Sequence, residues 1–475
     1  MSQKKISRRE LLKLSGTVIS GAILASCTPA STPTAAPTEP PAATAAPTVA
    51  PGATAAPTVA PTSAPPPKAV EGNVVVMAQR NELSEDQEAQ FEAENPGITI
   101  ELVEQSTERF FAMLAAGAQL DLYRTQAPIV PSLLARKLLY DLTPYFEASE
   151  LIKIDDLADA NKGYWAESAL EVGSGKIYGM VKDFSPDHTV WVNDAKFEEA
   201  GITPVDDTTP MTYEQWHDLA NQVAKFEGDR IATWGFGYSN GWIDRIWMDR
   251  LAETGKSLYK DGFTKIDFGD DTKALANYFY TVAKERLCES PVDASPNGWA
   301  GGDFAAGILA TMQYGYWFGG MCETDANRGK VRMLPAPTWS GVHQDPTVTA
   351  TGFVMMSGTQ VPDAAWKVFE WYMGGQPSID RAGSGWGVPA LKSQWSLMPN
   401  TTPFHQQVQK VLAGELAVSN VKLQYNPFLG EGSFYNAWNT HLNEALTGTI
   451  TFDELCSLTE KDVNTLISEG ISRMS

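Results

Sequence analysis

A long tract near the N-terminus limits how much of this chain can fold. Residues 28–68 are almost entirely Pro, Ala and Thr, and Ala-Ala-Pro-Thr recurs near residues 35, 45 and 55. The tract has no aromatic side chain to bury, and frequent Pro favours extended polyproline II, at about 3.1 Å per residue. We therefore expect residues 27–70 to be an unfolded spacer and residues 71–475 to carry the fold. Whether the threonines are glycosylated is left open.

The first 26 residues resemble a bacterial export signal, with a positively charged start and an apolar run over residues 14–25. At about 1.5 Å per residue, that run is too short to span a bilayer core of about 30 Å. Leu24-Ala25-Ser26-Cys27 resembles a lipobox, which predicts cleavage before Cys27 and lipid attachment to this residue. Residues 7–13 resemble a twin-arginine signal, with Leu11 where Phe is usual, so the export route is left open between twin-arginine and Sec. We expect a lipid-anchored protein on the outer face of the cytoplasmic membrane.

The remaining residues, 71–475, are enough for two domains of ordinary size. The formal net charge of the whole chain is −21, and such an acidic protein would be repelled by nucleic acid and by anionic lipid. Cys288, Cys322 and Cys456 have no metal-ligand spacing and are too few for a disulfide scaffold. A Cys288–Cys322 bridge is left open, and no cofactor or metal is expected.

Strand and helix patterns alternate along this part, which predicts an α/β fold. Residues 73–77, 98–103 and 120–123 have strand patterns, and residues 84–94 and 107–117 have helix patterns, with Ser84 as the expected N-cap. In open parallel sheets, ligands bind outside the carboxyl ends of the strands. The candidate residues at this rim are Gln79, Arg80, Asn81, Ser106, Thr107, Thr125 and Gln126.

Eight segments, taken in order, resemble the family 1 extracellular solute-binding proteins, the maltose-binding-like receptors of ABC importers. The first is Phe91-Glu92-Ala93-Glu94-Asn95-Pro96-Gly97-Ile98, followed by Leu114-Ala115-Ala116-Gly117 and Asp121. The others are residues 137–145, 175–179, 191–193 with 197–202, 212–216, 304–317, 335–337 and 387–390. The resemblance extends over nearly all of residues 71–475.

The resemblance implies a two-lobed, periplasmic-binding-protein-like fold, in which three crossing segments form a hinge and the lobes close on a solute. We place the crossings near residues 183–188, 335–352 and 386–391. Lobe one is then expected over 71–184 plus 345–387, and lobe two over 188–340 plus 390–475. The ligand is expected in the cleft between the lobes, where Gly352 ends one crossing.

Fourteen tryptophans are present, and several of them lie beside Gly, Asn and Asp. Trp242, Trp299, Trp317 and Trp386 are the cleft candidates of this kind, whereas Trp216 and Trp247 lie in helical patterns and are expected in the core. A sugar has an apolar C–H face that stacks on an aromatic ring and hydroxyl groups that need polar partners. The family resemblance assigns sugar stacking to Trp317 and Tyr435.

The polar partners expected from their positions are Arg80, at a strand end, and Asp183, Asp187 and His188, on a crossing. Arg80 is a departure from neutral-sugar sites, so an anionic solute, such as a sugar acid or a glycerophosphodiester, is left open. The expected function is that of an ABC importer receptor that captures a mono- or oligosaccharide and delivers it to the transmembrane subunits of a permease. We expect the protein to be a monomer.

An enzyme is not expected, because the sequence contains no nucleophile elbow, zinc-protease motif or phosphate-binding loop. The five histidines are scattered, and the adjacent pairs Asp206-Asp207 and Asp270-Asp271 are typical of solvated loops. A glycosidase needs two carboxylates at a set separation across the sugar, which sequence does not exclude. A surface polysaccharide-binding protein that works without a transporter is a further alternative.

Overall fold

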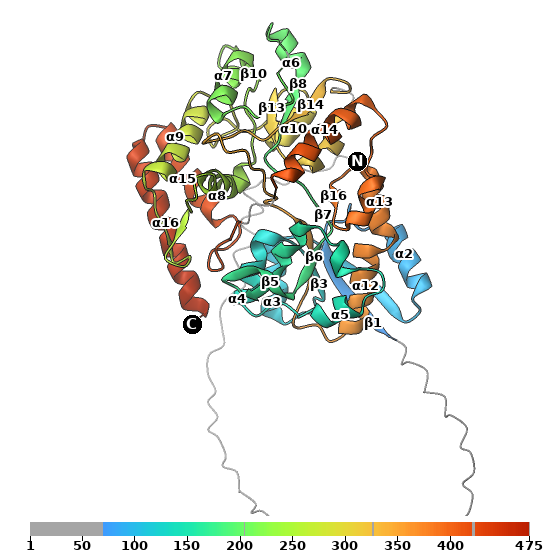
Figure 1. The fold of residues 1–475 in the computed structure, drawn as a ribbon. Coiled ribbons are helices and arrows are strands. Elements are labelled where there is room, and N and C mark those ends of the chain that lie inside the picture. The colour runs from blue at the N-terminus through green and yellow to red at the C-terminus, as the bar shows by residue number, and fades with distance from the viewer. Residues whose placement is uncertain (1–69, 204, 325–326, 420–422, 475) are drawn as a thin grey trace, which may run out of the picture. The chain divides into compact units, whose positions relative to one another are not determined.

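The computed structural model describes residues 70–203, 205–324, 327–419 and 423–474 (Figure 1). The expected export signal, the lipid-bearing Cys27 and the spacer as far as residue 69 lie outside these ranges, and they remain predictions. The described residues form one compact unit.

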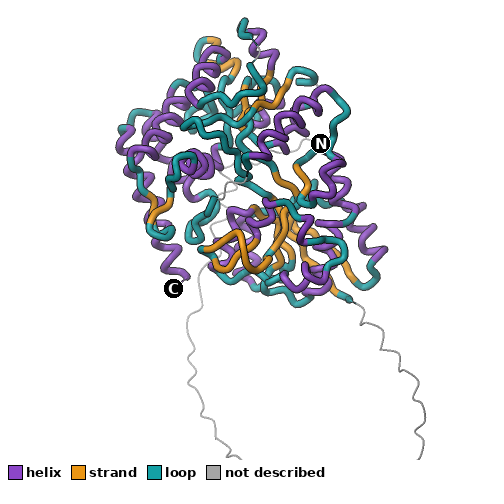
Figure 2. The backbone as a smooth tube through the Cα atoms, viewed as in Figure 1, coloured by secondary structure: helices purple, strands orange, loops and turns teal. Residues whose placement is uncertain are grey.

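Five strands form the first sheet: β1 (Gly72–Ala78), β2 (Ile98–Glu104), β3 (Leu122–Gln126), β6 (Gly179–Val181) and β15 (Thr351–Met355). Their order is β2-β1-β3-β15-β6. β1 is parallel to β2 and β3, whereas β15 is antiparallel to β3 and β6. Figure 2 shows these strands gathered in the lower part of the view. The predicted parallel sheet is therefore present in its first three strands, and β15, which comes from far along the chain, makes the sheet mixed.

The local sequence explains the elements of this sheet. β1 is buried from Val74 to Ala78, as expected for a strand covered on both faces. The next helix, α2 (Glu85–Glu94), begins at Ser84, whose side chain accepts a hydrogen bond from the backbone of Gln87 in a capping box. Helix α3 (Thr107–Ala116) ends at Gly117 in the left-handed conformation, with φ of 60°. These boundaries agree with the sequence-based predictions to within two residues.

A second, three-stranded sheet has the order β13-β8-β14, with both pairs antiparallel. Its strands are β8 (Val190–Asn193), β13 (Thr311–Gln313) and β14 (Val331–Leu334). The helices that belong with it carry a separate aromatic core, in which Trp216 stacks on Phe236 at 3.8 Å between ring centroids and Trp247 meets Trp438 at 5.0 Å. Trp216 and Trp247 are fully buried, so the prediction that they are core residues is confirmed.

The three segments predicted to cross between the lobes are hydrogen-bonded side by side. In the first and third, β7 (Asp183–Phe184) pairs antiparallel with β16 (Val388–Pro389). In the second, the backbone N–H groups of Val348 and Thr349 donate to the carboxylate of Asp187 at 2.8 and 2.9 Å. The residue boundaries given above for the two lobes remain a prediction.

The remaining elements lie around these sheets. The helices are α4 (Val130–Ala135), α5 (Thr143–Ala148), α6 (Asp194–Glu199), α7 (Tyr213–Val223), α8 (Ile243–Ala252), α9 (Asp270–Lys284), α10 (Ala300–Ala305), α11 (Gly319–Cys322), α12 (Pro362–Gly374), α13 (Gln376–Ser384), α14 (Pro403–Ala417), α15 (Ser433–Leu446) and α16 (Phe452–Met474). The strands are β4 (Trp165–Ser168), β5 (Glu171–Ile177), β9 (Lys225–Glu227), β10 (Arg230–Thr233), β11 (Tyr259–Lys260) and β12 (Lys265–Ile266). Short 3-10 turns are η1 (Ala127–Ile129), η2 (Ile154–Asp156), η3 (Asp159–Tyr164), η4 (Asn240–Trp242), η5 (Tyr316–Phe318) and η6 (Lys392–Leu397).

Cys288, Cys322 and Cys456 are buried free thiols, so the bridge left open between the first two is not formed. Burial in apolar surroundings raises the pKa of Cys322 well above its usual value. Among the residues that the structure describes, no helix combines the length and the apolar character needed to cross a membrane.

Candidate functional site

Four tryptophans that the sequence placed in the cleft come together around one buried tyrosine. The ring of Tyr314 lies 4.8 Å from Trp317, 5.4 Å from Trp242 and 5.9 Å from Trp299, measured between centroids. Trp386 joins this group through Trp317, at 6.5 Å. All four tryptophans are half-buried, whereas Tyr314 is buried. We call these five residues the aromatic cluster.

A glycine shortly before Trp317 and another directly before Trp386 allow the backbone turns that lead into these two tryptophans. Gly315 lies between β13 and η5, and a Cβ atom there would be 2.1 Å from the Oγ of Ser185, so only glycine fits. The chain can therefore turn directly after β13 and present Trp317. Gly385 ends α13 in the left-handed conformation, with φ of 72°, and Trp386 follows it.

Arg245 lies beside the aromatic cluster and was not predicted from the sequence. It lies one helical turn after Trp242, and its guanidinium is over the Trp242 ring, 5.7 Å from the centroid. Nη1 donates to the side chain of Gln126 at 2.6 Å and to the carbonyl of Val348 at 3.0 Å, and Nη2 lies 3.8 Å from Glu431. It thus joins the end of β3 to the aromatic cluster. The sequence did contain one indication of this position, because residues three apart on a helix lie on the same face and Arg245 is three residues after Trp242.

Tyr435, the other predicted stacking residue, lies on α15 and does not stack on the cluster. It lines a small hollow of about 40 Å³ together with Gly241, Asp244, Arg245 and Glu431. Because Gly241 is next to Trp242 in η4, the hollow lies beside the aromatic cluster. Tyr435 therefore lies near the four tryptophans, and its stacking role remains a prediction.

The predicted rim of the first sheet is only partly directed toward the cluster. Gln79, Arg80 and Asn81 follow β1 and are exposed, as is Thr107 at the start of α3. The guanidinium of Arg80, however, lies 3.3 Å from Glu88 on α2 and 3.4 Å from the carbonyl of Leu102. It is therefore engaged by neighbours on its own sheet.

The third strand extends further than the sequence predicted. Residues 120–123 were expected, but β3 runs from Leu122 to Gln126, because Thr125 and Gln126 pair with Gly352 and Thr351 of β15. Thr125 is consequently buried. Gly352 is also enclosed, since a Cβ atom there would be 2.0 Å from the carbonyl oxygen of Met180.

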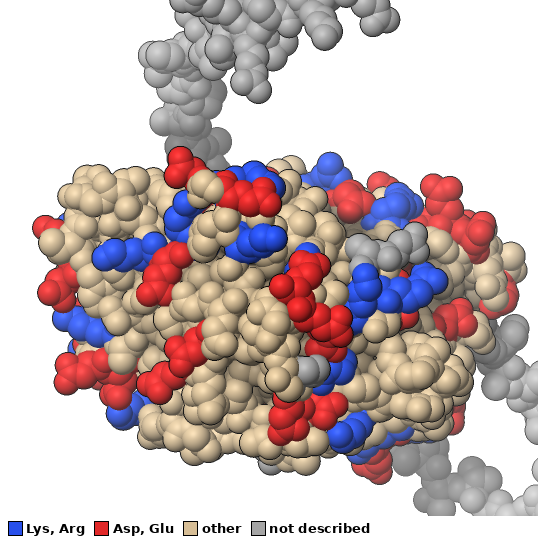
Figure 3. Space-filling model, turned by 90° about the horizontal axis from the view of Figure 1, so that it is seen from above, with Lys and Arg blue, Asp and Glu red and all other residues tan. Residues whose placement is uncertain are grey.

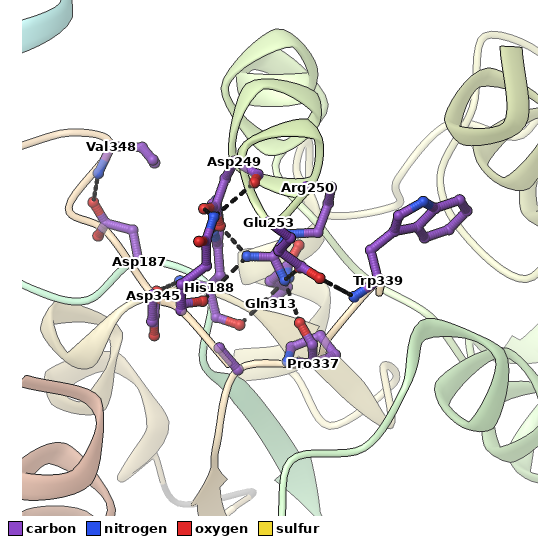
Figure 4. A network of polar contacts seen from close by, with 12 residues as sticks. Asp187, His188, Asp249, Arg250, Glu253, Gln313, Pro337, Trp339, Asp345 and Val348 are labelled. Carbon is purple, nitrogen blue, oxygen red and sulfur yellow. Dashed lines mark hydrogen bonds and ion pairs between the residues drawn. The ribbon is translucent and has the colours of Figure 1, made fainter. Parts of the chain in front are cut away.

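Asp187 and His188, predicted as ligand contacts, are instead tied to other parts of the protein (Figure 4). Asp187 accepts four hydrogen bonds of 3.0 Å or less, from Ser185, Val348 and two groups of Thr349. Nδ1 of His188 lies 2.6 Å from Asp249 on α8. Each residue is only 1% exposed, so a role in ligand contact stays a prediction that these partners do not support.

Asp249 belongs to a charged group on the C-terminal half of α8. Arg250 pairs with Asp249, lies 3.0 Å from Glu253 and donates to the carbonyl of Pro337. Glu253 in turn accepts from the backbone of Trp339 at 3.0 Å. Asp345 accepts from the backbone N–H of His188 at 2.8 Å. We call Asp187, His188, Asp249, Arg250, Glu253 and Asp345 the α8 network.

The pKa values of two carboxyl groups in this network are shifted in opposite directions. Burial raises the pKa of Asp345 well above its usual value, and the neighbouring charge of Glu415 adds to the effect. Burial alone would also raise the pKa of Asp249, but Arg250 and His188 hold it below the usual value. Of these two carboxyl groups, Asp345 is therefore the one whose protonated form is favoured.

Asp183, the remaining predicted site residue, belongs to a different buried group on the first sheet. Lys182 lies 2.6 Å from Asp183 and 3.2 Å from Glu82. Glu82 is also bound by both Nε and Nη2 of Arg124, at 2.5 and 2.8 Å. These charges compensate one another, so Asp183 is held by protein partners.

A larger cavity, of about 350 Å³, lies elsewhere along the crossing segments. Its lining includes Ala127, Gly163, Phe184, Ala350 and Trp395, and it contains none of the residues predicted for the site. Three aromatic side chains, Phe184, Trp395 and Tyr425, line it, and most of its other lining residues are small or aliphatic. We therefore place the candidate site at the aromatic cluster, where rings and polar groups converge.

Two observations bear on other classes of ligand. Among the described residues, no group of three or more His, Cys, Asp or Glu side chains could hold a metal ion. On the face that Figure 3 presents, Lys and Arg are interspersed with Asp and Glu among the described residues. This face therefore does not present the continuous basic surface that nucleic-acid binding needs.

Comparison with known proteins agrees with this architecture. Residues 88–394 match the family model described as "Bacterial extracellular solute-binding protein", and no curated protein sequence matches the chain. An ABC substrate-binding protein from Listeria monocytogenes in complex with cycloalternan is 18% identical, with a TM-score of 0.68 over 84% of this chain and 99% of that one. The sugar-binding protein MalE from Xanthomonas citri is 15% identical, with a TM-score of 0.62 over 84% and 98%. Maltose-bound MalE3 from T. maritima is 14% identical, with a TM-score of 0.64 over 83% and 99%.

These likenesses confirm the predicted two-lobed, periplasmic-binding-protein-like α/β fold. The family model covers more than half of the chain, and it confirms the resemblance found in the sequence. The chain belongs to the bacterial extracellular solute-binding proteins.

Proposed function

We propose that this protein is the extracytoplasmic receptor of an ABC importer, which captures a mono- or oligosaccharide in the cleft beside the aromatic cluster and delivers it to the permease. The convergence of Trp242, Trp299 and Trp317 on Tyr314, with Trp386 next to Trp317, carries this proposal. Half-buried rings have faces left to stack on the C–H side of a sugar, which fully packed core rings lack. No chemistry on the ligand is proposed.

Closure of the two lobes is the proposed mechanism. Trp386 lies after α13, at the start of the predicted third crossing, whereas Trp317 lies in η5, after strand β13 of the second sheet. A sugar that touches both rings would contact two segments that a hinge motion would bring together. A ligand shifts the equilibrium toward the closed form by the difference between its affinities for the closed and open forms. The closed, loaded form is the one proposed to dock on the permease.

Two of the three solved structures compared above contain a sugar, cycloalternan in one case and maltose in the other. At 18% and 14% identity they support a carbohydrate ligand by analogy of fold. They do not name the sugar for this chain.

Export and anchoring are part of the same proposal. We propose that residues 1–26 are removed, that Cys27 carries the lipid and that the Pro/Ala/Thr-rich spacer holds the receptor away from the outer face of the membrane as a monomer. Mass spectrometry of the membrane-extracted protein should find an acylated N-terminal peptide that begins at Cys27. Cys27→Ala should leave the protein unacylated, and an acylated C27A protein would contradict this assignment.

The function is tested by thermal denaturation of the purified protein with neutral mono- and oligosaccharides, sugar acids, polyols and glycerophosphodiesters. A ligand at 100 times its dissociation constant stabilises by about 2.7 kcal/mol, which shifts the transition measurably. We expect a sugar that raises the melting temperature and is recovered intact. Recovery of a cleaved sugar would favour a glycosidase, and no stabilisation by any sugar would contradict the proposal.

A further inference from the structure

A carboxylate that the sequence analysis did not single out lies against the aromatic cluster. The side chain of Asn240 donates to Oε1 of Glu289 at 2.8 Å. Asn240 opens η4, the same short turn that presents Trp242. Glu289 is half-buried, so it is neither a free surface residue nor sealed inside the core.

The groups around Glu289 come from the elements that form the cleft. Its negative charge contributes to the raised pKa values of Tyr314 in the cluster and of Tyr435 on α15. Asp303, on the helix that follows Trp299, is a second carboxylate close enough to act on it. Asp303 is itself held by the backbone and side chain of Asn297, at 3.1 and 2.8 Å.

No cation among the described residues offsets Glu289. Burial and the charge of Asp303 raise the pKa of Glu289 to about 7, and hydrogen bonds from the side chain of Asn240 and the backbone of Ala300 only partly oppose them. Both of these donors are uncharged, so the carboxylate has no charged partner among the described residues. It is therefore available as an acceptor for a donor group on a bound molecule.

The cations near the site are already engaged. Arg245, over the Trp242 ring, is bonded to Gln126 and Val348 and lies 3.8 Å from Glu431. Arg80, which left an anionic solute open at the level of sequence, is paired with Glu88. A negatively charged ligand would thus approach two carboxylates at the cluster without a free positive partner.

We infer that Glu289 contacts the ligand, and that the cleft takes a sugar whose hydroxyl or ammonium donors face this carboxylate and which carries no negative charge. The inference rests on the proposed function and names its ligand class. The rings stack on the C–H face of the sugar while Glu289 accepts from its polar edge, which gives a charge-assisted hydrogen bond. A sugar acid is excluded by like-charge repulsion from Glu289 and Asp303.

A pH dependence follows from the same geometry. The titratable groups that face Glu289 are Cys288 beside it, Tyr238 before η4, Asp303 on α10, Tyr314 after β13 and Tyr435 on α15. Burial raises the pKa of Cys288 and of the three tyrosines, so these groups keep their protons between pH 6 and 8. Glu289 loses its proton across this window, so a sugar whose ammonium group keeps its proton up to pH 8 should bind more tightly at pH 8 than at pH 6.

The experiment is calorimetric titration of the full-length protein with neutral sugars and with the 6-amino-6-deoxy and uronic-acid derivatives of each, which place an ammonium group that stays largely protonated at pH 8, or a carboxylate, on the same carbon. We expect the parent to bind a neutral or amino sugar and to bind the matching uronic acid at least tenfold more weakly. Glu289→Gln should weaken binding of the neutral sugar about tenfold and abolish the rise in amino-sugar affinity between pH 6 and 8. Glu198→Gln, which makes the same change on the exposed face of α6, should change neither affinity nor its pH dependence.

The outcomes separate this inference from the proposed function. If the parent binds no sugar, both fail together. If the parent binds a sugar but Glu289→Gln changes its affinity less than threefold, or if the uronic acid binds as tightly as the neutral sugar, the inference alone is overturned. The uronic-acid comparison uses the parent only, so it holds even if Glu289→Gln does not fold.

Discussion

The two ends of α8 belong to regions that are built in opposite ways. At its N-terminal end, Trp242 and Arg245 lie at the aromatic cluster, where rings are half-buried and Glu289 lacks a cation. At its C-terminal end, the side chains of Asp249 and Arg250 are wholly buried and bonded to each other and to the crossing segments. The α8 network holds the crossing segments in place, whereas the cluster keeps interaction capacity for a ligand. Substitutions at the two ends should therefore affect different measurements.

The largest effect on stability is expected at Arg250. Arg250→Met removes the partner of Asp249 and Glu253 and leaves two buried carboxylates without their cation. Breaking a buried ion pair in this way destabilises by about 3–5 kcal/mol. Chemical denaturation of the variant and the parent measures the loss, and a change below about 1 kcal/mol would show that the α8 network does not hold the fold.

Trp317→Ala should weaken ligand binding and leave the stability of the fold largely unchanged, which is the reverse of the effect expected for Arg250→Met. The ring is half-buried, so we expect the affinity for the sugar to fall at least tenfold, about 1.4 kcal/mol, while the protein stays folded. Trp371→Ala is the matched control, because Trp371 is also half-buried but packs on Phe91, at 4.8 Å, within the first sheet's helices. An unchanged affinity for Trp317→Ala would remove this residue from the site.

The stability contributed by Asp345, in the α8 network, should depend on pH. Its pKa is raised in the folded protein above the value near 3.8 that it has when unfolded, so the folded state holds more protons between these two values. The free energy of unfolding of the parent therefore falls as pH rises through this window, by at most about 1.4 kcal/mol per pH unit.

Asp345→Asn should lack this dependence, because the amide keeps an acceptor for His188 and carries no charge. We expect the variant to gain stability relative to the parent as pH rises from 4 to 7, in denaturation curves measured at each pH. A stability difference that stays constant with pH would mean that Asp345 ionises normally.

The smallest effect on stability is expected at His441, whose ion-pair partners are exposed to solvent. His441 joins α15 to α16 through Glu444 at 2.8 Å and Asp462 at 2.9 Å, and burial opposes but does not cancel the rise in its pKa that these carboxylates cause. The stabilisation is present below the unfolded pKa of about 6.5 and is lost as pH rises through the higher folded value.

Because the side chains of Glu444 and Asp462 are 40% and 49% exposed, we expect His441→Gln to lose less than about 1 kcal/mol. Denaturation at pH 6 and pH 9 is the measurement. The loss should be seen at pH 6 and vanish at pH 9, and a loss that is larger at pH 9 would contradict the assigned direction.

Local patterns predicted much of the first sheet correctly. The strand over residues 73–77 and the helix over residues 84–94, with Ser84 as its cap, are present almost as expected. Their patterns are complete within a few residues, because the apolar run and the capping box act locally. The third strand was placed too early, because Thr125 and Gln126 are polar and only pairing with β15 extends it.

The candidate site was predicted in part. Sequence context identified the four tryptophans, since a ring beside glycines and polar residues is unusual in a core. It did not identify Glu289, Arg245 or Tyr314, whose roles depend on neighbours from distant parts of the chain. It also selected Asp187 and His188 as ligand contacts, although both are enclosed by the residues they bind.

The sequence by itself determined the family, the acidic charge and the tendency of each segment to be strand, helix or spacer, because these depend on composition and on short-range patterns. The tertiary structure decided which polar groups have a full set of hydrogen-bond and charge partners within the protein and which do not. Asp187 and Glu289 are both acidic residues, yet Asp187 is almost fully buried and receives hydrogen bonds from the backbone of a segment 161 residues away, whereas Glu289 is half-buried and receives them from the side chain of Asn240 and the backbone of Ala300. Partners of that kind are set by packing between segments remote in sequence, and this difference separates a structural carboxylate from one available to a ligand.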